Sequence, residues 1–125
     1  MNSILLVALG GAVGSVARYG LGALVLRQTP GWSFPLGTFL VNVLGCFVAG
    51  LLIGLAEQHD FLTAELRLLL FTGFLGGFTT FSAFGVETVA LLQRGQLATA
   101  AAYVVLSVLC GLAVLWAAVK LGGAA

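Results

Sequence analysis

Residues 73–84 read GFLGGFTTFSAF and lie within a long apolar run that begins after Arg67 and continues to Leu92. A helix rising about 1.5 Å per residue over such a run spans a hydrocarbon core about 30 Å thick. Two adjacent glycines, Gly76-Gly77, followed by the threonines Thr79-Thr80 make a poor helix segment. The stretch therefore predicts a membrane-spanning helix that is broken near its middle.

Three further apolar runs accompany this one, and polar or charged residues separate them. Each is long enough to cross a bilayer. We expect an all-α membrane protein with four transmembrane helices at about 4–26, 36–56, 66–92 and 97–120, forming a single transmembrane domain over residues 1–125.

The composition agrees with that class. The chain is 61% hydrophobic and 7% charged, whereas a soluble domain has about 25% charged residues. The net charge of +1 provides no basic surface for nucleic acid. Cys46 and Cys110 lie inside apolar runs and are interpreted as packing residues. No catalytic grouping of Ser, His and Asp and no phosphate-binding loop occurs, so we do not expect an enzyme.

The positive charges are balanced between the two expected sides of the membrane. Arg67 and Lys120 lie on the side of the termini, and Arg27 and Arg94 lie on the other side. Positive charge sets the orientation of membrane proteins, so a tie predicts weak preference and insertion both ways up. The alternative is a chance tie in a chain with few charges.

Glycines four residues apart are typical of helices that approach closely. The chain has three such pairs: Gly10/Gly14, Gly50/Gly54 and Gly73/Gly77. Because four tightly packed helices leave little room to enclose a pathway, we expect an oligomer.

A break in the third helix would free backbone carbonyls that lipid cannot satisfy. Carbonyl and threonine oxygens are hard ligands suited to an alkali cation. If two subunits pack antiparallel, their breaks meet on the two-fold axis and can surround one ion. The alternative is a glycine kink whose carbonyls are satisfied by the hydroxyls of Thr79 or Thr80.

The remaining polar groups of the spans carry hydrogen-bond donors without a fixed charge at mid-depth. Such donors, together with the positive edges of phenylalanine rings, suit the passage of a dehydrated anion. Each also has a structural alternative, namely lipid or neighbour contact for the rings and an interhelical bond for the amide. The candidates are Thr38, Asn42, Thr80, Phe81, Ser82, Phe84, Tyr103 and Ser107.

Two charged residues of the spans have more than one interpretation. Arg18 can attract anions to a vestibule, or cap exposed carbonyls. Glu87 lies two turns before Arg94, near the interface, where a solvated or ion-paired carboxylate is expected. His59 lies in a polar loop without metal-ligand neighbours and is assigned no role.

Three motifs resemble those of the CrcB/Fluc family of fluoride channels: GGAVGSVARY at 10–19, GTFLVNVLGCF at 37–47 and GFLGGFTTFSAF at 73–84. The resemblance covers essentially the whole chain, in order. It implies an antiparallel, dual-topology homodimer in the bacterial inner (plasma) membrane, with two fluoride pores and a central, structural sodium ion that is not transported. Passive fluoride efflux would reduce toxicity in the cytoplasm.

The resemblance also implies roles for individual residues. The carbonyls of Gly76 and Thr79 look like the sodium ligands, and Phe81, Phe84 and Asn42 look like pore residues. Thr80, Ser82, Tyr103 and Ser107 resemble hydroxyl contacts of the pore, whereas Glu87, Thr38 and Arg18 are expected in vestibule or structural roles. Ala83 departs from the pattern, because many members have a hydroxyl residue there.

One alternative function is a small multidrug-type, proton-coupled exporter, which is also built from four short helices. Such exporters exchange protons through a carboxylate in the membrane. No Asp or Glu is expected at mid-depth in any of the four spans, which argues against this class.

Overall fold

The computed structural model describes residues 2–125, and every regular element in them is helical. The elements are α1 (Ser3–Gln28), α2 (Leu36–Gln58), α3 (Ala64–Arg67), the π-helix η1 (Leu68–Leu75), α4 (Gly76–Phe78), α5 (Phe81–Gln93) and α6 (Leu97–Ala124). The segment from α3 to α5 forms one bent span. Within residues 2–125 there are thus four helices long and apolar enough to cross a membrane.

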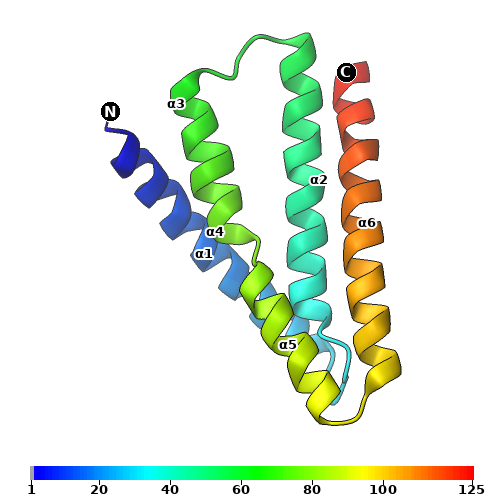
Figure 1. Ribbon diagram of the computed structural model, residues 1–125. Coiled ribbons are helices and arrows are strands. Elements are labelled where there is room, and N and C mark those ends of the chain that lie inside the picture. The colour runs from blue at the N-terminus through cyan, green and yellow to red at the C-terminus, as the bar shows by residue number, and fades with distance from the viewer. Residues whose placement is uncertain (1) are drawn as a thin grey trace.

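The spans run alternately up and down (Figure 1). Both ends of the chain and the loop between α2 and α3 lie at one end of the molecule, and the two other turns lie at the opposite end. Gly31 and Gly95 have φ angles of 79° and 76°, a left-handed conformation that glycine adopts without strain. These glycines allow the tight reversals after α1 and α5 that the polar residues there predict.

Glycines let two pairs of helices pack closely. Gly10 and Gly14 of α1 face the backbone of η1 and α4, where an added Cβ would strike the carbonyls of Leu69 and Phe74. Gly50 and Gly54 of α2 lie in the same way against α6. Because these contacts are made by backbone, larger residues would force the helices apart.

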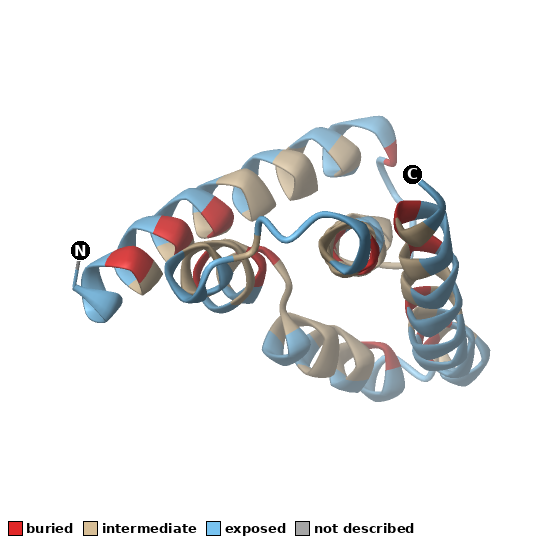
Figure 2. Cartoon of the chain, turned by 90° about the horizontal axis from the view of Figure 1, so that it is seen from above, coloured by how far each residue is buried: buried red, intermediate tan, exposed pale blue. Residues whose placement is uncertain are grey.

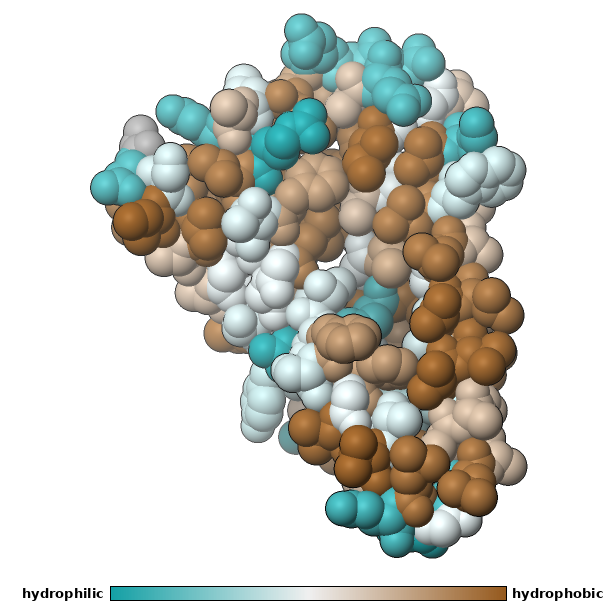
Figure 3. Space-filling model, viewed as in Figure 1, coloured by the Kyte–Doolittle hydropathy of each residue, from teal (hydrophilic) through white to brown (hydrophobic). Residues whose placement is uncertain are grey.

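In the view of Figure 3, hydrophilic residues gather at the two ends of the molecule and strongly apolar residues cover the flank formed by α6, whereas the middle is less apolar and includes some hydrophilic residues. Buried residues are confined to the inner sides of the helices (Figure 2). The outer face of α6 exposes large apolar side chains, among them Leu109, Leu112 and Trp116. Lipid is the environment in which such a surface is stable.

The third span is broken where α4 ends and α5 begins. The two glycines remain helical, and it is Thr79 and Thr80 that are extended, with φ/ψ of −82°/155° and −148°/118°. The predicted break therefore lies just after the glycines. The π-helical winding of η1 immediately before it was not predicted, although π-helices are frequent at functional sites.

Candidate functional site

The helix break is stabilised locally by its two threonines. The Thr79 hydroxyl donates over 2.8 Å to the carbonyl of Leu75, the last residue of η1, four residues earlier in the same span. The Thr80 hydroxyl accepts a 3.2 Å bond from the Ala83 N–H and so caps the start of α5. One threonine thus ends the upper helix and the other begins the lower one.

Asn42 of α2 binds both backbone groups of Thr80. Its Oδ1 accepts from the Thr80 N–H at 2.8 Å, and its Nδ2 donates to the Thr80 carbonyl at 3.1 Å. The interhelical bond that the sequence left as an alternative is therefore present. One of the two Nδ2 hydrogens is used in this way, and an amide has a second.

Arg18 of α1 satisfies another carbonyl at the break. Its Nε donates to the Gly77 carbonyl over 3.1 Å, which is the carbonyl-capping role considered for it. The carbonyls of Gly76, Phe78 and Thr79 differ from these two, because they accept no bond from another element within residues 2–125. From Gly76 to Thr80 the break thus presents two occupied and three available carbonyl oxygens.

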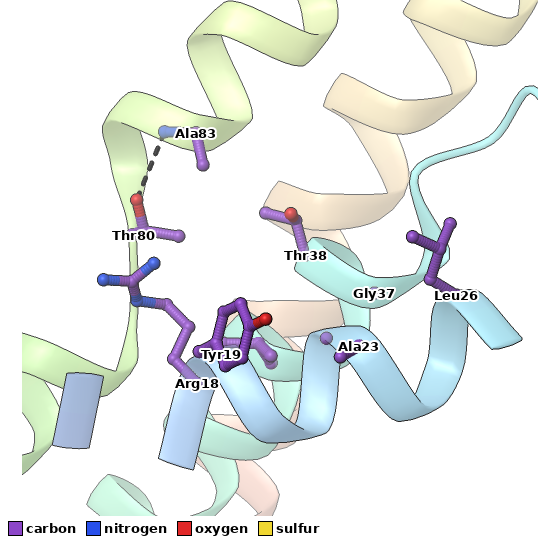
Figure 4. Close-up of a pocket in the computed structure, with 10 residues that line it drawn as sticks. Arg18, Tyr19, Ala23, Leu26, Gly37, Thr38, Thr80 and Ala83 are labelled. Atoms are coloured by element: carbon purple, nitrogen blue, oxygen red, sulfur yellow. Dashed lines mark hydrogen bonds between the residues drawn. The ribbon is translucent and has the colours of Figure 1, made fainter. Parts of the chain in front are cut away.

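A depression of about 340 Å³ opens beside the break. Arg18 extends from α1 toward Thr80, and Thr38 faces them from α2 (Figure 4). The N-terminus of α5 adds the positive end of a helix dipole nearby. Sequence reasoning did not single out Tyr19, Gly22 or Gly37 in this lining.

A second depression, of about 250 Å³, joins residues that the sequence assigned to different helices. Asn42, Thr79, Thr80 and Phe81 line it together with Cys46. Cys46 was interpreted as a packing residue, but it lies one turn after Asn42, and this spacing was the signal that could have found it. An amide, a hydroxyl and an aromatic ring are thus brought to one place.

Three aromatic rings continue from this point toward α6. The ring centroids of Phe81 and Phe84 are 5.6 Å apart, and those of Phe84 and Tyr103 are 5.0 Å apart. Phe81 is 84% exposed, whereas Tyr103 is completely buried. Phe81 and Phe84 are three residues apart and share one face of α5, and this face therefore leads from the surface into the core.

Glu87 is held by two hydroxyls. Thr38 donates to its Oε2 and Tyr103 to its Oε1, each over 2.9 Å. The ion pair that the sequence offered as one alternative for Glu87 is therefore not formed among the described residues. The reason is tertiary, since α2 and α6 bring their hydroxyls to α5 from positions far away in the sequence.

Two serines complete the predicted set. The Ser82 hydroxyl is exposed and lies 3.4 Å from the Thr80 hydroxyl. The Ser107 hydroxyl, one turn after Tyr103 on α6, is buried and has no hydrogen-bond partner among the described residues. An unpartnered hydroxyl at this depth is available to a ligand or to water.

The apolar helices and the polar break at depth together define a multi-pass α-helical membrane protein. The chain belongs to the CrcB family: a profile described as "CrcB-like protein, Camphor Resistance (CrcB)" matches residues 5–119.

Several similar proteins carry functional names. The chain is 55% identical over 116 residues to a protein of Methylobacillus flagellatus named "Fluoride-specific ion channel FluC", with 93% of this chain and 91% of the relative covered. A protein of the same name from Nitratidesulfovibrio vulgaris is 52% identical, with 93% of each chain covered. Another, from Paracoccus denitrificans, is 50% identical over 97% of this chain and 94% of the relative. These relatives are named as ion channels and not as enzymes.

Proposed function

We propose that this protein is a fluoride-selective ion channel, through which fluoride leaves the cytoplasm passively and its toxicity is reduced. The observation that carries the proposal is the shared depression lined by Asn42, Thr80 and Phe81 at the helix break. The names of the relatives, at 50–55% identity over nearly the whole chain, support the choice of fluoride.

The donors at this depression are suited to a small, strongly hydrated anion. The second Nδ2 hydrogen of Asn42, the hydroxyls of Thr80 and Ser82 and the edges of Phe81 and Phe84 replace water without adding a full positive charge. A full charge in direct contact would hold the anion too tightly to release it. Arg18 acts from the adjacent vestibule by raising the local anion concentration.

The track continues along α6 in this proposal. The buried Ser107 hydroxyl lies one helical turn from Tyr103 and has no partner, so it offers the next donor. The Tyr103 hydroxyl donates to Glu87 and contacts an anion only when it leaves that carboxylate. Thr38 and Glu87 mark its end in a neighbouring depression of about 270 Å³, which Trp32 also lines. When no anion is near, the Glu87 carboxylate accepts the hydrogen bonds of Thr38 and Tyr103. The role we propose for Glu87 is therefore structural.

The assembly we propose is an antiparallel homodimer in the bacterial inner membrane. The balanced charges at the two ends of the molecule support insertion in both orientations. The available carbonyls of Gly76 and Thr79 fit a structural sodium ion between the two breaks, because uncharged oxygens are its usual ligands. Within residues 2–125 no group of His, Cys, Asp or Glu offers a different metal site.

Efflux from liposomes tests the proposed function. Purified protein is reconstituted into vesicles loaded with potassium fluoride or potassium chloride, and anion release is followed with ion-selective electrodes after valinomycin is added. We expect rapid fluoride release and retention of chloride. Equal release of both anions, or of neither, overturns the proposal.

A second measurement distinguishes a channel from a proton-coupled exporter. No structural observation favours the exporter as the function of this protein. Fluoride release is compared with and without an imposed pH gradient at constant membrane potential. A channel responds to the potential alone. Release that requires the proton gradient would contradict passive efflux.

A further inference from the structure

We propose that Asn42 is the positioning residue of the cation site, because it aims the carbonyl of Thr79 away from α2 and toward the neighbouring subunit. The inference rests on the proposed function and assigns Asn42 a task distinct from contact with the anion. It starts from the bond between Oδ1 of Asn42 and the Thr80 N–H, which is 2.8 Å long.

The physical reason lies in the geometry of one peptide unit. The carbonyl of Thr79 and the N–H of Thr80 belong to the same planar, trans peptide, so they point in opposite directions. Because the N–H points at Oδ1 of Asn42, the Thr79 carbonyl points away from α2. No other side chain among the described residues binds this peptide.

The second bond of Asn42 removes a competing ligand. Its Nδ2 donates to the Thr80 carbonyl over 3.1 Å, so this oxygen is occupied. Arg18 occupies the Gly77 carbonyl in the same way. Two side chains from different helices therefore occupy two carbonyls at the break. Those of Gly76, Phe78 and Thr79 have no partner among the described residues, and the Thr79 carbonyl is the one whose direction Asn42 fixes.

Helix propensity alone would not hold this arrangement. Thr79 and Thr80 are extended, and the helical bond that the Thr80 N–H would make to the Gly76 carbonyl is absent. Without Asn42, both backbone groups of Thr80 lose their partners at membrane depth, which is costly. The threonine peptide would then turn to find other partners and the Thr79 carbonyl would lose its direction.

The test measures sodium binding and not flux. Thermal unfolding of the purified dimer in detergent is followed at increasing sodium, with N-methylglucamine keeping the ionic strength constant. Ligands that bind only the folded state raise its stability by mass action, so the concentration dependence reports affinity. The variants are Asn42→Ala and, should that variant not fold, Asn42→Ser, whose short hydroxyl cannot reach both groups of Thr80.

We expect either variant to need at least about tenfold more sodium than the wild type for the same stabilisation, equivalent to about 1.4 kcal/mol. The matched control is Cys110→Ala. Cys110 is a free cysteine on α6, outside the depression at the break, and it makes no side-chain hydrogen bond within residues 2–125. The control should keep the sodium dependence of the wild type.

The outcomes distinguish this inference from the proposed function. If Asn42 acts only on the anion, its variants lose fluoride flux but keep the sodium dependence of the wild type, and the inference is overturned. A wild type that conducts fluoride but gains no stability from sodium also overturns it while leaving the channel intact. Failure of the wild type to conduct fluoride is read from the liposome measurement and concerns the proposed function.

Discussion

The hydroxyl of Tyr103 on α6 donates a 2.9 Å hydrogen bond to Oε1 of Glu87 on α5. Tyr103 is completely buried, so this bond lies where α5, α6 and the start of α2 meet. Tyr103→Phe should therefore destabilise the protein by about 1–3 kcal/mol, because the carboxylate loses a donor that water cannot fully replace. Unfolding by SDS in dodecylmaltoside micelles measures the loss.

The control for this variant is Tyr19→Phe. Tyr19 is 77% exposed, so removing its hydroxyl should leave the free energy of unfolding nearly unchanged. Equal stability of the two variants would show that the bond to Glu87 contributes nothing measurable.

Phe81→Ile should lower fluoride flux by at least about tenfold, which is about 1.4 kcal/mol in the barrier. Isoleucine has no positive ring edge to replace water around the anion. Because Phe81 is 84% exposed in the single subunit, the fold of that subunit should be unaffected. Leu112→Ile, on the lipid-facing side of α6, is the control and should conduct normally. Normal flux through Phe81→Ile would remove the ring from the pathway.

Gly54→Ala should destabilise the protein by about 1–3 kcal/mol, since a methyl group there strikes the backbone of α6 at Val119. Gly85→Ala is the matched change at an open position, where a Cβ meets no atom within 4 Å. It should be neutral or stabilise the helix by up to about 1 kcal/mol. SDS unfolding compares the two. An equal effect of both would mean that the close approach of α2 and α6 is not required.

The double variant Arg27→Gln/Arg94→Gln should insert in one orientation only. Of the positive charges at the helix ends only Arg67 and Lys120 then remain, because Arg18 lies within the first span, so their side should face the cytoplasm. A C-terminal reporter that is active on one side of the membrane measures the orientation. The wild type should give both signals, and the variant only the cytoplasmic one.

Flux provides the second readout of the same prediction. A chain confined to one orientation cannot form an antiparallel dimer, so the double variant should lose fluoride efflux. Co-expression with the opposite variant, Arg67→Gln/Lys120→Gln, should restore efflux. A wild type found in a single orientation, or a double variant that conducts alone, would contradict the antiparallel arrangement.

Much of the fold was predictable from local sequence, because membrane insertion depends on hydropathy over about 20 residues and not on distant contacts. The four apolar helices and the bend in the third follow from that pattern. The exact position of the break was harder to predict from the sequence. Gly76 and Gly77 remain helical because η1 and α1 pack around them, and the two threonines take the extended conformation instead.

The residues of the candidate site could also be predicted only in part, because local sequence identifies side-chain types and tertiary packing decides their partners. Hydroxyl, amide and ring side chains were recognised on the second, third and fourth spans, because polar groups inside apolar runs are costly and therefore mark candidate sites. The partners of Glu87 were not predicted, because Thr38 and Tyr103 reach it from two other helices. The bonds from Asn42 to Thr80 were only one of two alternatives for the same reason.

By itself, the sequence determined that the chain is a four-helix membrane protein whose third span is broken, because the free-energy cost of placing unpaired polar backbone in lipid is local and large. Only the tertiary structure decided which backbone carbonyls at that break are occupied. Arg18 and Asn42 bind those of Gly77 and Thr80, and this choice depends on how α1 and α2 pack against the third span.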